Sequence, residues 1–282
     1  MSVMGNERAV VIGGGGVAGI AWANGVIAGS ADAGIDLTDA DVYIGTSAGA
    51  NVAAQLTSGL TVEELMRRQL EPSLQSAEIV PEGDPLAAAW GTIEQLIEET
   101  GGDPAAVRQR LGGLAAAAET VPEAARRAVV ESRLPVHEWP RQRLLITAVD
   151  TATGEPRVFD RDSGVALVDA VTASSAVPMV WPAHTVDGVR YMDGGIRTSV
   201  NADLAAGYAR VLILAPLPDE ALDGQIEGLV AGGARVESIV PDENAVAAFG
   251  TNPLDTVTRV PAASAGRIQG KSLAPRIARL WE

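Results

Sequence analysis

The chain has 282 residues, of which 47% are hydrophobic and 20% charged, and its formal net charge at pH 7 is −15. This composition is typical of a globular protein and excludes a disordered or coiled-coil chain. The negative charge argues against electrostatic docking on nucleic acid or on anionic lipid headgroups. The absence of cysteine excludes disulfides, thiolate metal sites and cysteine nucleophiles.

Residues 1–8 carry neither the basic nor the apolar segment of a secretory signal, and no stretch approaches the roughly 18 apolar residues of a spanning helix. We therefore expect a soluble, cytoplasmic protein. A chain of this length can bury one large α/β core, so we expect a single domain over residues 1–282. The arginine pairs at 67–68 and 126–127 are typical of solvated helix faces.

The first elements form two successive strand, loop and helix units. A continuous apolar run at 8–12 predicts a buried parallel strand, and a helical pattern follows at 17–33. The second unit has a strand at 41–44 and a helix at 50–56. The elbow between the strand and the helix of the second unit should therefore lie beside the first strand.

Residues 61–134 differ in composition from the residues before them, since Ala, Glu and Arg dominate and no convincing strand pattern is present. We expect a helical insertion there, which forms either a lid or wall of an acyl pocket or a packing layer over the sheet. The expected helices are 62–70, 86–100, 104–118 and 122–132.

Strands and helices alternate again after residue 142, which predicts a mostly parallel sheet covered on both faces. The expected strands are 143–149, 156–159, 189–192 and 210–214, and the expected helices are 165–175 and 199–207. The stretch 242–282 has a partly helical pattern with glycine and proline breaks.

The loop Gly13-Gly14-Gly15-Gly16-Val17-Ala18-Gly19 lies between the first strand and the first helix. Its G-x-G-x-x-G spacing fits a dinucleotide pyrophosphate held by backbone N–H groups, and the same geometry fits an oxyanion. A dinucleotide fold needs an acidic residue at the end of the second strand, whereas this strand ends in Gly45-Thr46-Ser47. The second unit therefore disfavours a nucleotide site.

Ser47 occupies the centre of Gly45-Thr46-Ser47-Ala48-Gly49, between a strand and a helix. The G-x-S-x-G spacing indicates a nucleophile elbow, a strained turn that small flanking residues permit and that exposes the serine hydroxyl. The adjacent helix N-terminus supplies free N–H groups and partial positive charge to an oxyanion. An acyl-transfer enzyme is the leading hypothesis.

A serine nucleophile needs a base, and Asp193 in Asp193-Gly194-Gly195 follows a predicted strand. A carboxylate within hydrogen-bond reach can accept the serine proton directly. The two histidines, His137 and His184, both precede Asp193 and lie in proline-flanked segments, so a Ser, Asp, His order is absent. We expect structural roles for both histidines and a Ser47–Asp193 dyad.

These motifs together resemble the patatin-like phospholipases, lipid acyl hydrolases that use a Ser–Asp dyad. The resemblance rests on the glycine loop, G-T-S-A-G, the segment Ala173-Ser174-Ser175-Ala176-Val177-Pro178, and D-G-G with the downstream Asn201. It extends from residue 8 to about residue 207, apart from much of the helical insertion. It implies a three-layer α/β/α fold with a mostly parallel central sheet.

The resemblance implies that Ser47 is the nucleophile, that Asp193 is the base, and that the N–H groups of Gly14, Gly15 and Gly16 form the oxyanion hole. It implies a lipid or ester substrate, no cofactor and no metal. We also expect transient membrane contact and no nucleic-acid partner, while the oligomeric state does not follow from the sequence.

Two residues depart from the family pattern: Ala18 stands where Arg or Lys is usual, and Asp203 stands where proline is usual. The missing cation at Ala18 motivates an alternative hypothesis, in which the fold is kept but serves as a catalytically weak or idle lipid or acyl-chain binding protein.

Overall fold

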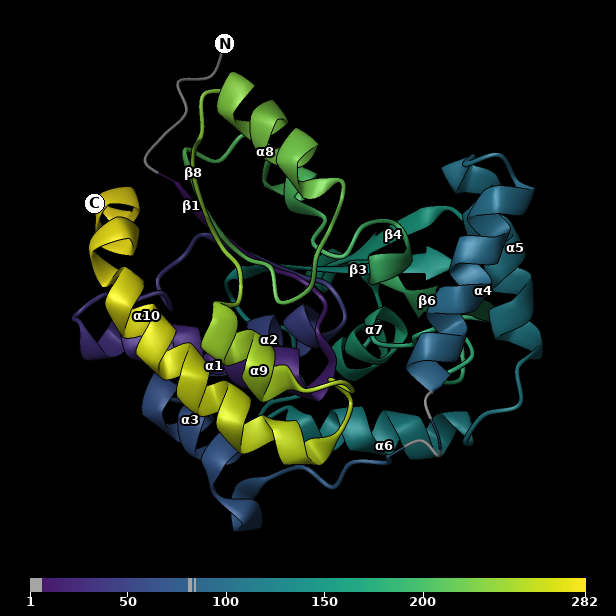
Figure 1. Ribbon diagram of the computed structural model, residues 1–282, viewed down its shortest axis with the longest axis horizontal. Helices are drawn as coiled ribbons and strands as arrows, with labels where there is room; N and C mark the ends of the chain where they lie inside the picture. Colours follow the sequence, from purple (N-terminus) through teal and green to yellow (C-terminus); the bar gives the residue numbers. More distant parts are fainter. Residues whose placement is uncertain (1–6, 81–82, 84) are drawn as a thin grey trace.

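The computed structural model describes residues 7–80, 83 and 85–282. Residues 1–6, which carry most of the segment examined for a secretory signal, lie outside the described residues. The described chain forms one eight-stranded sheet with helices on both faces (Figure 1). The strands are β1 (Arg8–Ile12), β2 (Val42–Gly45), β3 (Arg143–Asp150), β4 (Pro156–Phe159), β5 (His184–Val186), β6 (Val189–Asp193), β7 (Arg210–Leu214) and β8 (Arg235–Ile239).

The strand order is β5-β6-β3-β2-β1-β7-β8, and β4 pairs with β3 beside this path. Five neighbouring strands in this order are parallel to one another: β3, β2, β1, β7 and β8. β4 and β6 run antiparallel to β3, and β5 runs antiparallel to β6. β1, β2 and β7 are apolar and buried, as expected of central parallel strands. The predicted α/β class with a mostly parallel sheet is confirmed.

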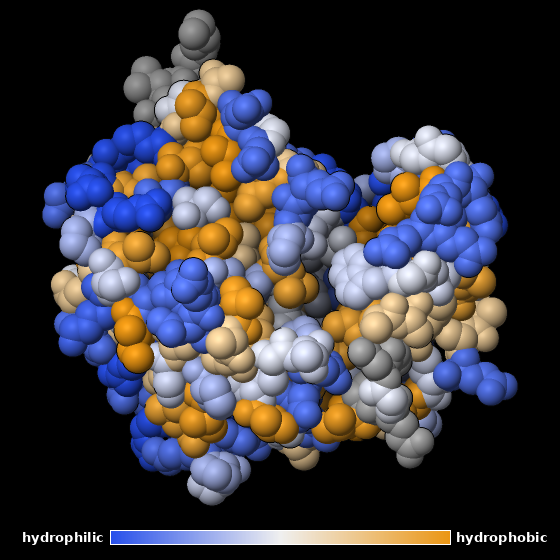
Figure 2. Space-filling model, viewed as in Figure 1, coloured by the Kyte–Doolittle hydropathy of each residue, from blue (hydrophilic) through white to orange (hydrophobic). Residues whose placement is uncertain are grey.

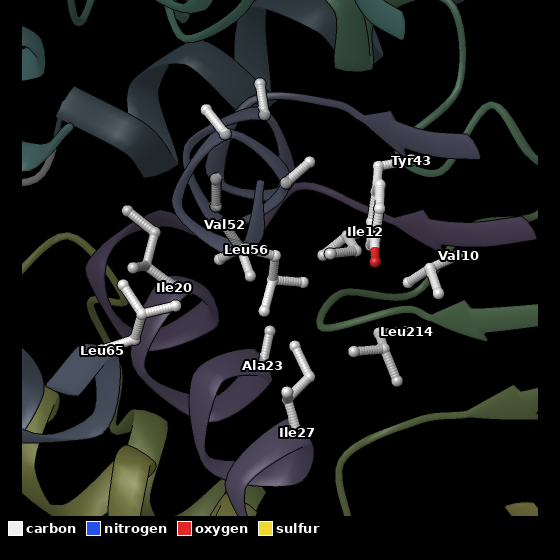
Figure 3. Packing of buried hydrophobic residues seen from close by; sticks show 14 of the residues in the cluster. Val10, Ile12, Ile20, Ala23, Ile27, Tyr43, Val52, Leu56, Leu65 and Leu214 are labelled. Atoms are coloured by element: carbon white, nitrogen blue, oxygen red, sulfur yellow. The ribbon is translucent and has the colours of Figure 1, made fainter. Parts of the chain in front are cut away.

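Alternate residues of β1 point to opposite faces of the sheet and thereby divide the core. Val10 and Ile12 pack with α1 and α2, whereas Ala9 and Val11 pack with α8. Figure 3 shows the first of these clusters, in which Ile12 from the sheet faces residues of α1 and α2. The helices are α1 (Gly16–Asp32), α2 (Ala48–Leu56), α3 (Val62–Leu70), α4 (Pro85–Glu99), α5 (Pro104–Ala117), α6 (Glu123–Arg133), α7 (Leu167–Ser174), α8 (Leu222–Ala231), α9 (Glu243–Phe249) and α10 (Arg259–Trp281).

Helices α3 to α6 occupy the segment between α2 and β3, where the sequence predicts an insertion. α3 packs on α1, and α6 packs on α7. α4 and α5 lie together beside β3 and β6, where Leu96, Leu111 and Val149 form a separate small core (Figure 1). That residues 61–134 are an insertion within a single domain stays a prediction.

Four elements differ from the sequence-based expectation. The helix expected at 199–207 is a short 3-10 turn, Ala202–Ala205, because Asn201 at φ 56° and Gly207 at φ 93° hold a left-handed backbone that a helix does not permit. β5, α8 and β8 were not anticipated. The partly helical pattern at 242–282 corresponds to α9, a 3-10 turn and the long α10.

α10 packs along α1 at very close range, because glycines face backbone on both helices. A Cβ on Gly25 would lie 2.2 Å from the Ala263 carbonyl oxygen, and one on Gly266 would lie 2.3 Å from the Trp22 carbonyl oxygen. Real Cβ atoms do not approach so closely, so these positions require glycine. The C-terminal helix is thereby fixed to the helix that follows the glycine-rich loop.

Candidate active site

Ser47 lies between β2 and α2 with φ 55° and ψ −115°, an uncommon and strained conformation for a residue with a side chain. The glycines around it have no room for a Cβ. One on Gly45 would lie 2.5 Å from Ala50 Cα, and one on Gly49 would lie 1.9 Å from the Ile12 carbonyl oxygen. The turn has the geometry of a nucleophile elbow, with Ser47 at the N-terminus of α2.

Asp193 ends β6 and is 4% exposed. Its Oδ1 accepts a 2.7 Å hydrogen bond from Gly195 N–H, and Oδ2 has no hydrogen-bond partner of good geometry among the described residues. Burial raises the pKa of the Asp193 carboxyl to about 6, although the Ser47 hydroxyl, Gly195 N–H and the charge of Arg126 each lower it. The hydroxyl is thus close enough to act on this carboxyl.

The end of α7 and the residues that follow it connect Ser47 to Asp193. Ser174 Oγ accepts a 2.9 Å hydrogen bond from Ser47 N–H, and the Ala176 carbonyl accepts a 2.9 Å bond from Asp193 N–H. Ser175 Oγ accepts from Asn51 Nδ2 on α2 at 3.2 Å. Consecutive residues of A-S-S-A-V-P therefore position both members of the predicted dyad.

Asn201 links the same two turns from the other side. Its Nδ2 donates to Thr46 Oγ1 at 3.0 Å and to the Gly194 carbonyl at 3.3 Å. Arg197 donates to Asn201 Oδ1 at 2.7 Å and forms an ion pair with Asp203. The acidic residue at position 203, which departs from the family pattern, thus holds the arginine that orients Asn201.

The glycine-rich loop lies against the elbow, since a Cβ on Gly14 would be 3.6 Å from Ser47 Cβ. Gly14 N–H donates to the Ser199 carbonyl at 2.8 Å, so in this conformation it is not free for an oxyanion. The N–H groups of Gly15 and Gly16 have no partner among the described residues. Gly15 and Gly16 thus keep free donors at the start of α1, and the assignment of the three glycines to an oxyanion hole stays a prediction.

Ala18, which stands where the family usually has a cation, is fully buried on α1. Its N–H donates to the Pro253 carbonyl at 3.0 Å, in the loop before α10. The C-terminal part of the chain therefore packs directly against the start of α1.

Ser47, Asp193 and the glycine loop meet in one cavity of about 840 Å3, measured with the solvent at its open mouth. The walls are mostly apolar. Figure 2 shows the surface hollowed between the α4–α5 pair and the rest of the molecule. The apolar lining residues are Val17, Ile20, Ile79, Leu86, Trp90, Val177, Trp181, Ile196, Leu217, Pro253 and Leu254.

One lining residue was read wrongly from the sequence. Arg126 on α6 is 3% exposed, not solvated, and its guanidinium carbon lies 3.9 Å from the centre of the Trp181 ring. Sequence reasoning missed it because two adjacent arginines on a helix look alike, although only Arg126 faces inward while Arg127 pairs with Asp169 outside the cavity.

Neither histidine lines the cavity. The buried His184 lies 3.0 Å from carboxylates of both Asp169 and Glu123, and His137 is exposed. Among residues 7–80, 83 and 85–282, no group of three or more His, Asp or Glu side chains is placed to hold a metal ion. No helix in the same ranges is long and apolar enough to cross a membrane.

Solved structures with a similar chain trace include VipD from Legionella pneumophila, at 13% identity and a TM-score of 0.48, over 96% of this chain and 67% of that one. The type III effector protein ExoU matches at 16% identity and a TM-score of 0.37, over 94% of this chain and 54% of ExoU. ExoU in complex with SpcU, from Pseudomonas aeruginosa, matches at 13% identity and a TM-score of 0.35, over 94% and 53%. This chain thus spans about half the length of ExoU.

No curated protein matches the chain significantly. The sequence profile of the patatin-like phospholipases matches residues 10–206, which is more than half of the chain. The matched span includes the glycine loop, Ser47 and Asp193. The chain therefore belongs to the patatin-like phospholipase family, whose members are lipid acyl hydrolases.

Proposed function

We propose that the protein is a serine acyl hydrolase that cleaves carboxylic ester bonds of lipids, with Ser47 as nucleophile and Asp193 as base. The observation that carries the proposal is the position of a strained serine beside a buried carboxyl, in one apolar cavity. The N–H groups of Gly15 and Gly16 are assigned to the oxyanion hole, since Gly14 N–H is occupied by Ser199.

The raised pKa of Asp193 supports its role as a base. A pKa of about 6 leaves the carboxyl ionised at neutral pH, yet makes it a much stronger base than an exposed aspartate. Oδ2 has no hydrogen-bond partner of good geometry, so it remains free to accept a proton. Catalytic hydrogen bonds often tighten only when substrate binds, so a loose Ser47–Asp193 contact is compatible with this role.

The reaction would proceed in two acyl-transfer steps. Ser47 Oγ attacks the ester carbonyl carbon while Asp193 accepts the hydroxyl proton, and the N–H groups of Gly15 and Gly16 donate to the resulting oxyanion. Asp193 then returns the proton to the departing alcohol. Water, deprotonated by Asp193, attacks the carbonyl carbon of the acyl-Ser47 ester. Asp193 then returns that proton to Ser47 Oγ as its bond to the acyl carbon breaks, which releases the fatty acid and restores both side chains.

The cavity walls favour an acyl chain as the group that lies beside the dyad. Leu86 and Trp90 of α4 also line an adjoining outer groove, together with Leu217 and Pro253. A chain that enters the cavity would remove water from these apolar surfaces. Trp90 is 46% exposed, so we also propose that this mouth makes transient contact with a membrane while a lipid enters.

Hydrolysis of p-nitrophenyl esters of increasing chain length tests the proposal. The wild type, Ser47→Ala and Asp193→Asn would be purified alike and checked for folding by circular dichroism. We expect turnover by the wild type, labelling of Ser47 by a fluorophosphonate, and loss of turnover in both variants. A folded wild type that shows neither turnover nor labelling would favour the idle binding protein, the alternative that Ala18 motivates.

A further inference from the structure

We infer that Arg126 forms an anion-binding subsite inside the cavity, which recognises the phosphate of a lipid headgroup while the ester lies at Ser47. The inference rests on the proposed function, because it assigns the substrate class of the same site. Arg126 is a specificity-determining residue in this assignment, and it takes no part in the acyl-transfer steps themselves.

Three buried arginines, Arg126, Arg133 and Arg259, lie together in this region, and within the described part of the chain only the last two have a carboxylate partner. Arg133 donates to both oxygens of Glu78, at 3.0 and 2.6 Å, and Arg259 donates to Oε1 of the same carboxylate at 2.8 Å. Although burial raises it, the pKa of Glu78 is lowered to about 2, chiefly by Arg133, so Glu78 is ionised. Its charge is shared by two other guanidinium groups, which leaves Arg126 without an ion-pair partner.

Arg126 also makes no hydrogen bond to any residue that the structure describes. Its Nε and Nη1 are buried and have no partner among the described residues. Burial and the charge of Arg133 lower the pKa of Arg126 to about 9, which still leaves the guanidinium protonated at neutral pH. A buried cation without a partner is costly, and an anionic ligand with oxygen acceptors would remove that cost.

Arg126 lies in the same cavity as Ser47, so it can bind an anionic group of a substrate whose ester lies at Ser47. α6 places Arg126 and Arg133 seven residues apart on one face, and both line the cavity with Ser47 and Asp193. Trp181 stacks on the guanidinium and orients it without using its N–H groups. Asp193 is the other acidic residue whose charge acts on Arg126, but Asp193 Oδ2 and the Nε and Nη1 of Arg126 have no hydrogen-bond partner among the described residues.

The chemistry of the cavity favours a phosphate attached to an acyl chain over a free anion. The guanidinium fork binds phosphate oxygens in pairs. Apolar residues such as Ile79, Leu86 and Trp90 make up most of the remaining wall, where a free anion gains nothing. An acyl ester that carries a phosphate satisfies both parts of the cavity.

Two short lipids that differ only in the headgroup phosphate test the assignment: dioctanoylglycerol and its 3-phosphate, in the same neutral detergent. We expect Arg126→Gln to lower the ratio of kcat/KM for the phosphate over the neutral lipid by about tenfold or more, the usual loss for a charged hydrogen bond. Arg126→Lys, which keeps the charge but not the fork, should recover part of this ratio. Arg127→Gln is the matched control on the outer face of α6 and should leave it unchanged.

A ratio that is unchanged in Arg126→Gln would overturn the inference. If kcat/KM falls equally for both lipids, Arg126 has a structural or general electrostatic role, and if neither value falls, Arg126 does not contribute to either substrate. Circular dichroism and thermal melting check folding, and removal of an unpaired buried charge should not lower the melting temperature.

A binding measurement keeps the inference testable even if no hydrolysis is found. The melting temperature of Ser47→Ala would be measured with decyl phosphate below its micelle concentration, with decanol, and with inorganic phosphate. We expect decyl phosphate to raise it most, and the additional Arg126→Gln substitution to abolish that increment. An equal shift with inorganic phosphate, or no shift with decyl phosphate, would overturn the headgroup assignment. Absence of fluorophosphonate labelling of the wild type would count against the proposed catalysis alone.

Discussion

The substitution Asp193→Asn should stabilise the protein at pH 8 and leave its stability nearly unchanged at pH 4. The pKa of Asp193 is about 6 in the folded state against a usual 3.8, so the folded protein binds this proton more tightly than the unfolded chain does. Protonated Asp193 therefore contributes its full stabilisation of the folded protein below pH 3.8, and this contribution is lost as the pH rises through 6. A difference of about 2 pKa units corresponds to about 3 kcal/mol.

Urea unfolding of the wild type and Asp193→Asn, followed by circular dichroism at several pH values, measures this difference. Comparison of the two proteins at each pH cancels the other carboxylates, which titrate alike in both. The difference in unfolding free energy should grow by about 3 kcal/mol between pH 4 and pH 8. A difference that does not change with pH would refute the claim that Asp193 is a desolvated carboxylate.

Three further results are expected. Ester hydrolysis should lose about tenfold in kcat/KM per pH unit below pH 6, as Asp193 is protonated; a pH profile without this acid limb would contradict its role as base. Gly266→Ala, whose Cβ would meet the Trp22 carbonyl, should lower the unfolding free energy by about 1–3 kcal/mol. Gly228→Ala on the exposed face of α8, where a Cβ meets nothing, should instead raise it by about 0.5–1 kcal/mol. Asn201→Asp removes the Nδ2 donor to Thr46 and Gly194 and places a carboxylate at a fully buried position, so it should lower kcat of the folded protein about tenfold or more and the unfolding free energy by about 1–3 kcal/mol; unchanged kcat would show that this link does not position Ser47 and Asp193.

The parts of the fold that follow from local pattern were predictable from the sequence. The apolar runs at 8–12 and 210–214 are strands because both faces of a central parallel strand are buried. The G-x-S-x-G spacing predicts the turn at Ser47 because its constraints lie within five residues. The motifs also lie together in the fold, since strand ends of a parallel sheet meet at one edge.

Features that depend on distant partners were not predictable in the same way. Asn201 interrupts the expected helix because its side chain bonds to Thr46, more than a hundred residues earlier in the chain. The direction of Gly14 N–H depends on the loop at Ser199. The burial of Arg126 depends on Trp181 and on the insertion, neither of which local charge pattern reveals.

The glycine contact between α1 and α10 affects where this protein can be shortened. The family match ends at residue 206, yet α1, which begins at Gly16, is covered by a helix formed from residues 259–281. The Pro253 carbonyl, just before α10, holds the first turn of α1. A fragment cut at residue 206 would lose β7, the neighbour of β1, and would expose the glycine face of α1 to water. The smallest unit that could be expressed with an intact glycine-rich loop therefore extends to the end of α10, well beyond the segment that identifies the family.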